Sequence, residues 1–384
     1  MKFAFIIFKY FPFGGMQRDM LRTANELIKR GHAVEIFTMQ WQGDSPVNVK
    51  VHALPQTGLF NYQRYQKFID ATFLQIKTEN FDYIFGYNRM AGLDAHFAAD
   101  PCFVERAYKQ RNFLYRLLPR FKWFAACEKA VFSSESATEI LAVSLAEKPH
   151  FQRWYGTQDA RFHYIPPCLL PERFALKPKL EARAYLRQQF NFSADDFVYL
   201  LTGSGFAMKG LDRAILALAM LPTALRANTR LIAAGQDNPK QFTKLAQKLG
   251  VAANVVISKG RPDIPQLMQG ADVCVHPAYR ENTGLVILEG MASATPMLVT
   301  ASCGYAHYVR DANAGLVCEM PFEQANFNAL FAQMRTSEHK QIWADNGLKQ
   351  AQKLMQENDG SAEAKILIRL ADEKQAKAKK ALHV

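Results

Sequence analysis

Short apolar runs alternate with longer segments of helical periodicity along most of the chain. Residues 3–8, 83–87, 198–202 and 231–234 are such runs. A strand covered by helices on both faces is apolar at nearly every position, so runs of this length are typical of a parallel sheet. The alternation predicts an α/β fold of two Rossmann-like, doubly wound parallel-sheet domains facing across a cleft.

The first run opens a predicted β-loop-α-β unit. Residues 17–30 carry apolar side chains at helical spacing, and residues 33–38 form the next predicted strand. Gly14 and Gly15 lie in the loop between them and let a ligand approach the backbone before a helix N-terminus, although a plain tight turn is the alternative. The loop lacks the G-x-G-x-x-G spacing and no acid ends the second strand, so the pattern gives little support to dinucleotide binding.

The most informative stretch is residues 271–300. Its pattern predicts a buried strand at 273–276, a loop broken by Pro277, an apolar helix from Gly284 to about 292, and a second strand at 297–300. The loop therefore leaves the carboxyl end of a strand. Open α/β sheets bind their ligands at this end.

Glu281 and Glu289 bracket the joint between this loop and the helix. Eight helical residues would place them about 80° apart around the axis and about 12 Å apart along it. Backbone N–H groups at the helix start lack intrahelical partners and form an anion site. The residues that carry these groups are Asn282, Thr283, Gly284 and Leu285. Acids on both sides of a phosphate-binding turn suit a nucleotide-sugar, with one acid on sugar hydroxyls and the other on ribose hydroxyls.

A chance pair on a solvated helix face is the alternative for these two glutamates. Glu289, however, follows three apolar residues, 286–288, in a segment that the pattern predicts to be buried. An unpaired carboxylate there would be costly. The surroundings therefore favour a functional pair.

A second glycine-rich loop, residues 203–210, follows the strand predicted at 198–202. It matches neither the Walker A spacing nor G-x-G-x-x-G, because Met208 stands at the third glycine position. Lys209 could neutralise a diphosphate leaving group at this strand exit. A solvent-exposed surface lysine is the alternative.

Residues 103–132 combine basic and aromatic side chains with few acids. This composition suits an interfacial helix on anionic lipid, although single-stranded nucleic acid and inward packing with a solvated basic rim are alternatives. Pro119 is expected to kink or split the helix. The candidate membrane contacts are Arg111, Phe113, Arg116, Arg120, Lys122 and Trp123.

Three prolines at 166, 167 and 171 predict a hinge between the two domains. The predicted boundaries give an acceptor-side domain at 1–165 and a nucleotide-sugar-binding domain at 166–355. A C-terminal helix follows at 356–384, with a basic tail that frays from about Lys374. Arg173, just beyond the prolines, could reach donor phosphates or be a plain surface charge.

The composition narrows the class of partner and the compartment. A formal net charge of +12 favours acidic partners such as anionic lipid, nucleic acid or a phosphorylated substrate. Six cysteines without a C-x-x-C, and nine histidines without metal-ligand spacing, argue against a disulfide framework or zinc site and fit a reducing cytosol. No apolar run is long enough to span a bilayer, and the run at 3–8 is too short for a signal peptide.

The spacing of Glu281 and Glu289 resembles the E-x7-E signature of retaining glycosyltransferases of family 4 with the GT-B fold. Three further segments resemble the lipopolysaccharide core glucosyltransferase branch of that family. They are KYFPFGGMQRD at 9–19, NRMAGLDAHFAAD at 88–100 and CGYAHYVRDANAG at 303–315. The resemblance covers nearly the whole chain and is weakest at 135–160 and after about 355.

The resemblance implies transfer of glucose from UDP-glucose to an inner-core heptose of lipopolysaccharide, with retention at the anomeric carbon. Glu281 would hold glucose hydroxyls and Glu289 the ribose, while Lys209 and Arg173 would stabilise the leaving diphosphate. Further residues implied near the donor are Gly15, Asp19 and Arg261, and Asp100 is implied near the acceptor; Asp19 could instead be a first-turn helix acid. Relatives often carry Arg where Met208 stands. This chain therefore has one positive charge fewer at the donor site.

The resemblance implies no metal or other cofactor, and no residue is identified as a nucleophile. It places the protein in the cytoplasm, peripheral on the inner face of the inner membrane of a Gram-negative bacterium. The alternatives are a related hexosyltransferase with another donor, such as UDP-galactose, or another glycolipid acceptor. Two further alternatives belong to other functional classes: a non-catalytic membrane-surface protein and a nucleotide-dependent oxidoreductase.

Overall fold

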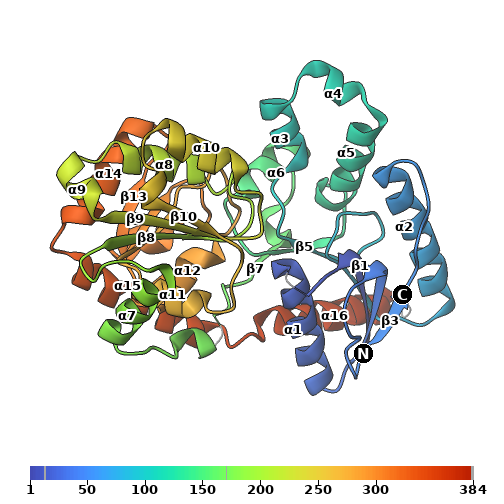
Figure 1. The fold of residues 1–384 in the computed structure, drawn as a ribbon. Helices are drawn as coiled ribbons and strands as arrows, with labels where there is room; N and C mark the ends of the chain where they lie inside the picture. The colour runs from blue at the N-terminus through green and yellow to red at the C-terminus, as the bar shows by residue number, and fades with distance from the viewer. Residues whose placement is uncertain (13, 170, 382–384) are drawn as a thin grey trace. The chain divides into compact units, whose positions relative to one another are not determined.

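The chain folds into two α/β units, each built on one parallel sheet (Figure 1). The computed structural model describes residues 1–12, 14–169 and 171–381, so Phe13 of the first glycine loop and Leu170 of the proline-rich segment lie outside the described residues. The first unit comprises Met1–Pro166 and Gly360–Val384, and the second comprises Pro167–Asp359. The C-terminal helix is therefore part of the first unit.

The first unit has a seven-stranded sheet in the order β3-β2-β1-β4-β5-β6-β7, with every adjacent pair parallel. The strands are β1 Lys2–Tyr10, β2 Ala33–Trp41, β3 Lys50–Ala53, β4 Tyr83–Gly86, β5 Ala95–Ala98, β6 Glu139–Ala142 and β7 Phe162–Tyr164. The helices are α1 Gly15–Lys29, α2 Asn61–Thr78, α3 Phe103–Gln110, α4 Phe113–Leu117, α5 Pro119–Phe132, α6 Lys148–Tyr155 and α16 Ala362–Ala381. A 3-10 turn, η1 Asp159–Arg161, precedes β7.

Strand β1 is central, which explains its unbroken apolar run. Alternate residues enter two different cores: Phe5 packs in the cluster that includes residues of α1 and α16, and Ile6 packs in the cluster that includes residues of α2 and α5. Both side chains are fully buried. A polar residue in the middle of β1 would therefore have no solvated face on either side of the sheet.

The second unit has a six-stranded parallel sheet in the order β10-β9-β8-β11-β12-β13. Its strands are β8 Phe197–Thr202, β9 Thr229–Ala234, β10 Val255–Ser258, β11 Val273–His276, β12 Met297–Thr300 and β13 Gly315–Cys318. Its helices are α7 Lys179–Phe190, α8 Leu211–Ala219, α9 Thr223–Ala227, α10 Lys240–Lys248, α11 Ile264–Gly270, α12 Leu285–Ala292, α13 Ala306–Asp311, α14 Gln324–Thr336 and α15 Lys340–Glu357, with 3-10 turns η2 Pro171–Phe174 and η3 Ala252–Asn254.

The strand order of the second unit places a topological switch point between β8 and β11. From β8 the chain proceeds outward through β9 to β10, and it then returns to the other side of β8 for β11, β12 and β13. The loops after β8 and β11 therefore meet at the carboxyl edge of the sheet, where doubly wound folds bind ligands. These are the two loops that the sequence singled out. The predicted two doubly wound parallel-sheet domains are confirmed.

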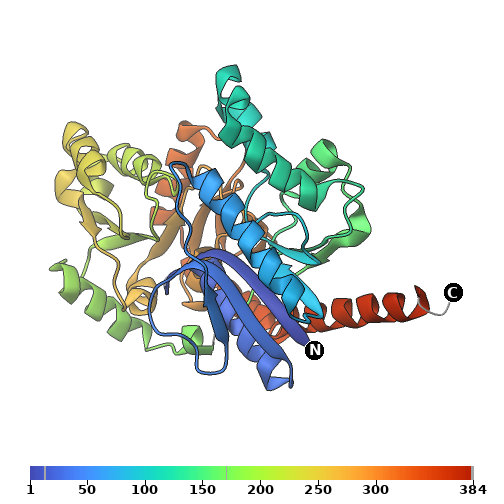
Figure 2. The ribbon, with the colours of Figure 1, turned by 90° about the vertical axis from the view of Figure 1, so that its right-hand side faces the viewer.

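Helix α16 continues to Ala381, although the sequence predicts fraying from Lys374. Specific contacts hold its second half on the first unit, where Lys374 pairs with Asp94 at 2.7 Å and Gln375 donates to Asp82 at 2.8 Å. Figure 2 shows α16 as a long, straight helix that leads to the C-terminus. The basic composition of the tail predicted its solvation but not these two contacts.

Glu363, in the first turn of α16, is a buried carboxyl group. It is 1% exposed, and it accepts a hydrogen bond from the Tyr87 hydroxyl at 2.8 Å. Arg22 of α1 lies 3.9 Å from its other oxygen and also pairs with Asp19 at 2.7 Å. Burial, reinforced by the negative charge of Asp19, raises the pKa of Glu363 to about 7.

Replacing Glu363 with Gln is expected to stabilise the protein at pH 8. In the folded state Glu363 stays protonated up to about pH 7, whereas in the unfolded chain it ionises near the ordinary glutamate pKa of 4.5. Unfolding between these pH values releases a proton, so raising the pH from 5 to 8 favours the unfolded state by about 2–3 kcal/mol. Urea unfolding at pH 5 and pH 8 measures this difference, which the variant should lack. The exposed Glu373→Gln variant on the same helix is the control, and an identical pH slope in both variants would contradict the assignment.

Candidate active site

The loops that follow β8 and β11 touch each other through a glycine. Gly210, which precedes α8, has a φ of 74°, and a Cβ atom placed on it would lie 2.1 Å from the carbonyl oxygen of Pro277. Only glycine fits so close a backbone approach at that φ. This contact brings the lysine of the first loop beside the acid of the second.

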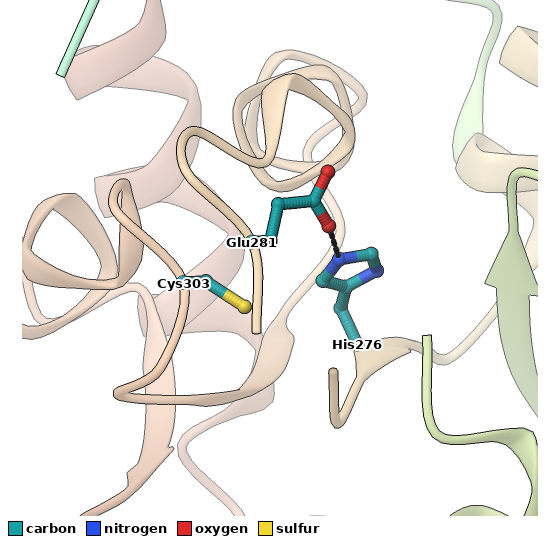
Figure 3. Close-up of side chains that lie close together, drawn as sticks. All are labelled: His276, Glu281 and Cys303. Carbon is teal, nitrogen blue, oxygen red and sulfur yellow. Dashed lines mark hydrogen bonds and ion pairs between the residues drawn. The ribbon is translucent and has the colours of Figure 1, made fainter. Parts of the chain in front are cut away.

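Glu281 is the centre of the site, because a basic side chain lies within hydrogen-bond distance of each carboxylate oxygen. Lys209 Nζ lies 2.5 Å from Oε1, and His276 Nε2 lies 2.5 Å from Oε2 (Figure 3). Burial acts to raise the pKa of Glu281, but the bonds and charges of His276 and Lys209 outweigh it and lower the pKa to about 2. At neutral pH Glu281 is therefore ionised, so it accepts hydrogen bonds but is a poor general base.

Backbone pairing with the turn after β12 fixes the position of Glu281. Its N–H donates to the carbonyl of Ser302 at 3.2 Å, and its own carbonyl accepts from the N–H of Gly304 at 3.0 Å. Two residues on, the Thr283 carbonyl accepts from Tyr305 at 2.8 Å. Backbone hydrogen bonds therefore hold the loop that carries Glu281 against the turn after β12.

Helix α12 begins beside this loop, as the sequence predicts. Gly284 is its N-cap at φ 93° and ψ 51°, a left-handed conformation that glycine adopts without strain. The N–H groups of Leu285 and Val286 have no acceptor within the helix, whereas the N–H of Ile287 donates to the Gly284 carbonyl at 2.8 Å. The first turn carries no acidic residue, so the positive end of the helix is not neutralised locally. Asn282, just before it, has a largely buried side chain.

Glu289 and Arg173 form the second acid–cation pair, with 3.0 Å between the guanidinium and the carboxylate. Glu289 lies inside α12, and Arg173 lies in the 3-10 turn η2, which packs against α12. Both side chains are mostly shielded from solvent. The structure thus brings together two of the predicted donor-binding residues from segments more than a hundred positions apart.

The turn after β9 supplies a residue that the sequence reasoning missed. Asp237 accepts hydrogen bonds from the backbone N–H groups of Gly205 and Phe206, the second at 2.8 Å. Two amides of the glycine-rich loop therefore bind a carboxylate of the protein. The only signal in the sequence was the position of Asp237 at a strand exit. Arg261, in the turn after β10, pairs with Asp263 at 2.7 Å.

The predicted residues of the first unit follow two of its strands: Gly15 and Asp19 follow β1, which borders the switch point between β1 and β4, and Asp100 follows β5, the next strand beyond β4. A Cβ placed on Gly15 would meet nothing within 4 Å, so the described chain leaves open space there. Asp19 lies beyond the first turn of α1, which carries no acid, and pairs with Arg22. The alternative role of a first-turn helix acid is therefore wrong. Asp100 is exposed, and its backbone carbonyl accepts from Arg89 at 2.7 Å.

The sequence spacing showed no set of metal ligands, but the tertiary structure brings together three side chains that could bind a metal ion. His276, Glu281 and Cys303 place potential ligand atoms within 4.8 Å of one another (Figure 3). They come from the end of β11, the following loop and the turn after β12. A ligand set drawn from three segments shows no motif along the chain.

The basic and aromatic segment forms α3, α4 and α5, and Pro119 starts α5, so the expected split is confirmed. Buried Glu128 anchors it by accepting from the N–H groups of Phe103 and Val104 at 2.7 and 3.0 Å. Figures 1 and 2 show α5 beside α2, with which it makes contact. Among the described residues, no helix is both long and apolar enough to cross a bilayer.

The surface of α4 exposes large apolar side chains next to basic ones. The exposed fraction of Phe113 is 63% and that of Leu114 is 67%. This α4–α5 patch consists of the exposed apolar residues Phe113, Leu114, Leu117 and Leu118 with the exposed basic residues Arg111, Arg120 and Lys122. Two predicted contacts lie differently: Arg116 covers the ring of Tyr108, with 4.3 Å to its centroid, and the Trp123 indole donates to Gln66 of α2 at 2.8 Å.

Two protein-family models match the chain. The model described as "Glycosyltransferase Family 4" matches residues 13–173, and "Glycosyl transferases group 1" matches residues 183–350. The structure of Anabaena Alr3699/HepE in complex with UDP-glucose aligns with a TM-score of 0.70 and 18% identity over 99% of this chain and 100% of that one, which shows a shared fold.

Two closer similarities cover nearly the whole chain. The lipopolysaccharide glucosyltransferase WaaG of Escherichia coli (strain K12) is 40% identical over 344 residues, which are 89% of this chain and 92% of that protein. A crystal structure of WaaG, a glycosyltransferase involved in lipopolysaccharide biosynthesis, aligns with a TM-score of 0.87 and 38% identity over 95% of this chain and 99% of that one. This chain therefore belongs to the family of the lipopolysaccharide glucosyltransferase WaaG, within the family 4 glycosyltransferases.

Proposed function

We propose that this glycosyltransferase moves glucose from UDP-glucose to an inner-core heptose of lipopolysaccharide, with retention at the anomeric carbon. The observation that carries the proposal is the pair Lys209–Glu281 at the switch point, beside the N-terminus of α12. The Glu281 carboxylate can accept hydrogen bonds from sugar hydroxyls, and Lys209 and the helix N-terminus are two positive centres for a phosphate. The chain that carries this arrangement is 40% identical to WaaG.

The donor diphosphate binds at the start of α12 in this proposal. The first-turn amides, from Thr283 to Leu285, would donate to its oxygens. Lys209 would exchange one carboxylate oxygen of Glu281 for the β-phosphate, and Glu281 would then accept hydrogen bonds from glucose hydroxyls. Glu289 would accept from the ribose hydroxyls, and Arg173 beside it adds positive charge for the diphosphate. The turn that carries Arg261 would lie near the nucleobase.

Bond breaking follows from this placement. As the bond between the anomeric carbon and the β-phosphate oxygen breaks, negative charge develops on that oxygen, and Lys209 with the helix amides stabilises it. The acceptor hydroxyl attacks from the same face, and its proton passes to the departing phosphate. Glu281 does not take this proton, because its pKa is about 2.

Covalent catalysis by the E-x7-E pair is not part of the proposal. A retaining glycosidase needs two carboxylates about 5 Å apart across the reacting bond. Here Glu281 and Glu289 belong to separate acid–cation pairs, one with Lys209 and one with Arg173. No metal is required, since these cations and the helix amides compensate the diphosphate charge.

The first unit would supply the remaining substrate contacts. The open space at Gly15 and the carboxylate of Asp19 support a role near the donor sugar. The exposed Asp100 is proposed to lie near the acceptor. Its place at the carboxyl end of β5 is the supporting observation.

The α4–α5 patch is proposed to hold the enzyme on an anionic membrane. Exposed apolar side chains would enter the interface while the neighbouring basic side chains meet lipid headgroups. The net charge of +12 acts in the same direction. This gives a peripheral protein on the inner face of the inner membrane of a Gram-negative bacterium, where a lipid-anchored acceptor is accessible.

A donor screen tests the proposed function. The purified full-length protein is incubated with a lipopolysaccharide acceptor that ends in inner-core heptose and with UDP-glucose, UDP-galactose or ADP-glucose. We expect turnover with UDP-glucose at least tenfold faster than with the other donors, and an α-linked glucose by NMR. Preference for another donor would replace the glucosyl assignment, and the absence of turnover with every donor would contradict transfer to this acceptor.

A further inference from the structure

The three potential metal ligands at the site lie in a mostly buried position. The side chains of His276 and Cys303 are 1% and 3% exposed, whereas Glu281 keeps 19% of its surface. The Nδ1 atom of His276 is buried without a hydrogen-bond partner among the described residues. The cluster is therefore reached from the side of Glu281, the side on which Lys209 lies.

The ligand types favour a borderline-soft cation. Imidazole nitrogen, carboxylate oxygen and thiolate sulfur are the ligands of zinc sites, with bonds of about 2.0–2.3 Å. A tetrahedral ion with such bonds separates its ligand atoms by about 3.4–3.6 Å. The present atoms lie within 4.8 Å of one another, so a shift of about 1 Å would close the set.

We propose that His276, Glu281 and Cys303 form an inhibitory site for a borderline-soft divalent cation such as Zn²⁺. Cys303 Sγ bonds to the ion and releases its proton to solvent. His276 binds through Nε2, and the proton of that nitrogen moves to Nδ1. A carboxylate oxygen of Glu281 supplies the third bond, and water supplies the fourth.

Inhibition follows because the ion occupies the carboxylate that the proposed donor sugar needs. Only this consequence rests on the proposed function; the binding of the ion does not. The cluster of Glu35, His52 and Glu79 in the first unit is a weaker candidate. Lys2 lies 2.9 Å from one of its carboxylates and 2.6 Å from the other, and the cluster has no thiol.

Cobalt spectroscopy tests the site without an activity assay. The full-length protein is purified in EDTA, freed of chelator and titrated with CoCl₂. We expect a thiolate-to-cobalt charge-transfer absorption in the near ultraviolet that ZnCl₂ abolishes by competition. The absorption should disappear in Cys303→Ala and remain in Cys318→Ala, which removes another buried thiol of the same unit. Cys303→Ser is the second variant if Ala destabilises the fold, because a serine hydroxyl gives no such absorption.

The activity arm measures inhibition by ZnCl₂. We expect inhibition that EDTA reverses, with a half-inhibitory concentration at least tenfold higher in Cys303→Ala than in the unmodified protein and Cys318→Ala. An absent absorption, or one that persists in both Cys303 variants, overturns the site. Equal zinc sensitivity with and without Cys303 overturns the inhibitory role. If the donor screen finds no transfer, the cobalt absorption still decides whether the ion binds.

Discussion

Replacing Glu281 with Gln is expected to lower kcat for sugar transfer by about 10²–10³-fold. Glutamine keeps the shape but loses the charge, and its amide nitrogen cannot accept from Lys209 or His276, which both donate to the carboxylate in the native protein. One charged, preorganised interaction at a reacting centre is worth about 3–4 kcal/mol. Steady-state kinetics with UDP-glucose and the heptose acceptor measure the change.

Three companion variants show whether the loss comes from the Lys209–Glu281 pair. Lys209→Met should reduce kcat by a similar factor, and the double variant should lose much less than the product of the two, because the residues act as one pair. Glu319→Gln removes an exposed acid that pairs with Arg310 in the same unit, so its activity should stay within twofold. If Glu281→Gln keeps more than a tenth of the native kcat, the role given to Glu281 is wrong.

The combined change Arg111→Gln, Arg120→Gln and Lys122→Gln is expected to weaken binding to anionic vesicles by about 100-fold at low salt. Each basic side chain near an anionic surface contributes about 1 kcal/mol, so three of them contribute about 3 kcal/mol. The loss should shrink as salt screens the charges. Sedimentation with vesicles that contain phosphatidylglycerol measures it, and neutral phosphatidylcholine vesicles give the baseline.

A matched change elsewhere separates the patch from the net charge. Lys377, Lys379 and Lys380 are exposed on α16, and replacing all three with Gln removes the same number of charges. This control should bind vesicles almost normally, and the patch variant should keep its activity on a detergent-solubilised acceptor. Equal losses in both triple variants would show that overall charge, and not the α4–α5 patch, attracts the protein to the membrane.

Local patterns in the sequence predicted each element that forms the site. The apolar runs predicted β8, β11 and β12. The glycine followed by an apolar segment predicted the start of α12 at Gly284. Pro119 gave the break before α5. These features depend on residues within a few positions of one another, because side-chain periodicity and glycine or proline stereochemistry act over one or two turns.

The tertiary structure alone decided which side chains meet. Lys209 and Glu281 are neighbours because β11 returns to lie beside β8, and the same strand order sets Cys303 against the loop of Glu281. Asp237 reaches the amides of Gly205 because β9 lies on the other side of β8. Such contacts depend on strand order and register, which local periodicity does not encode. The sequence by itself therefore indicated the elements, the two acids and the candidate cations Lys209 and Arg173, while the pairing of these acids and cations, and the buried histidine and thiol beside them, followed from the fold.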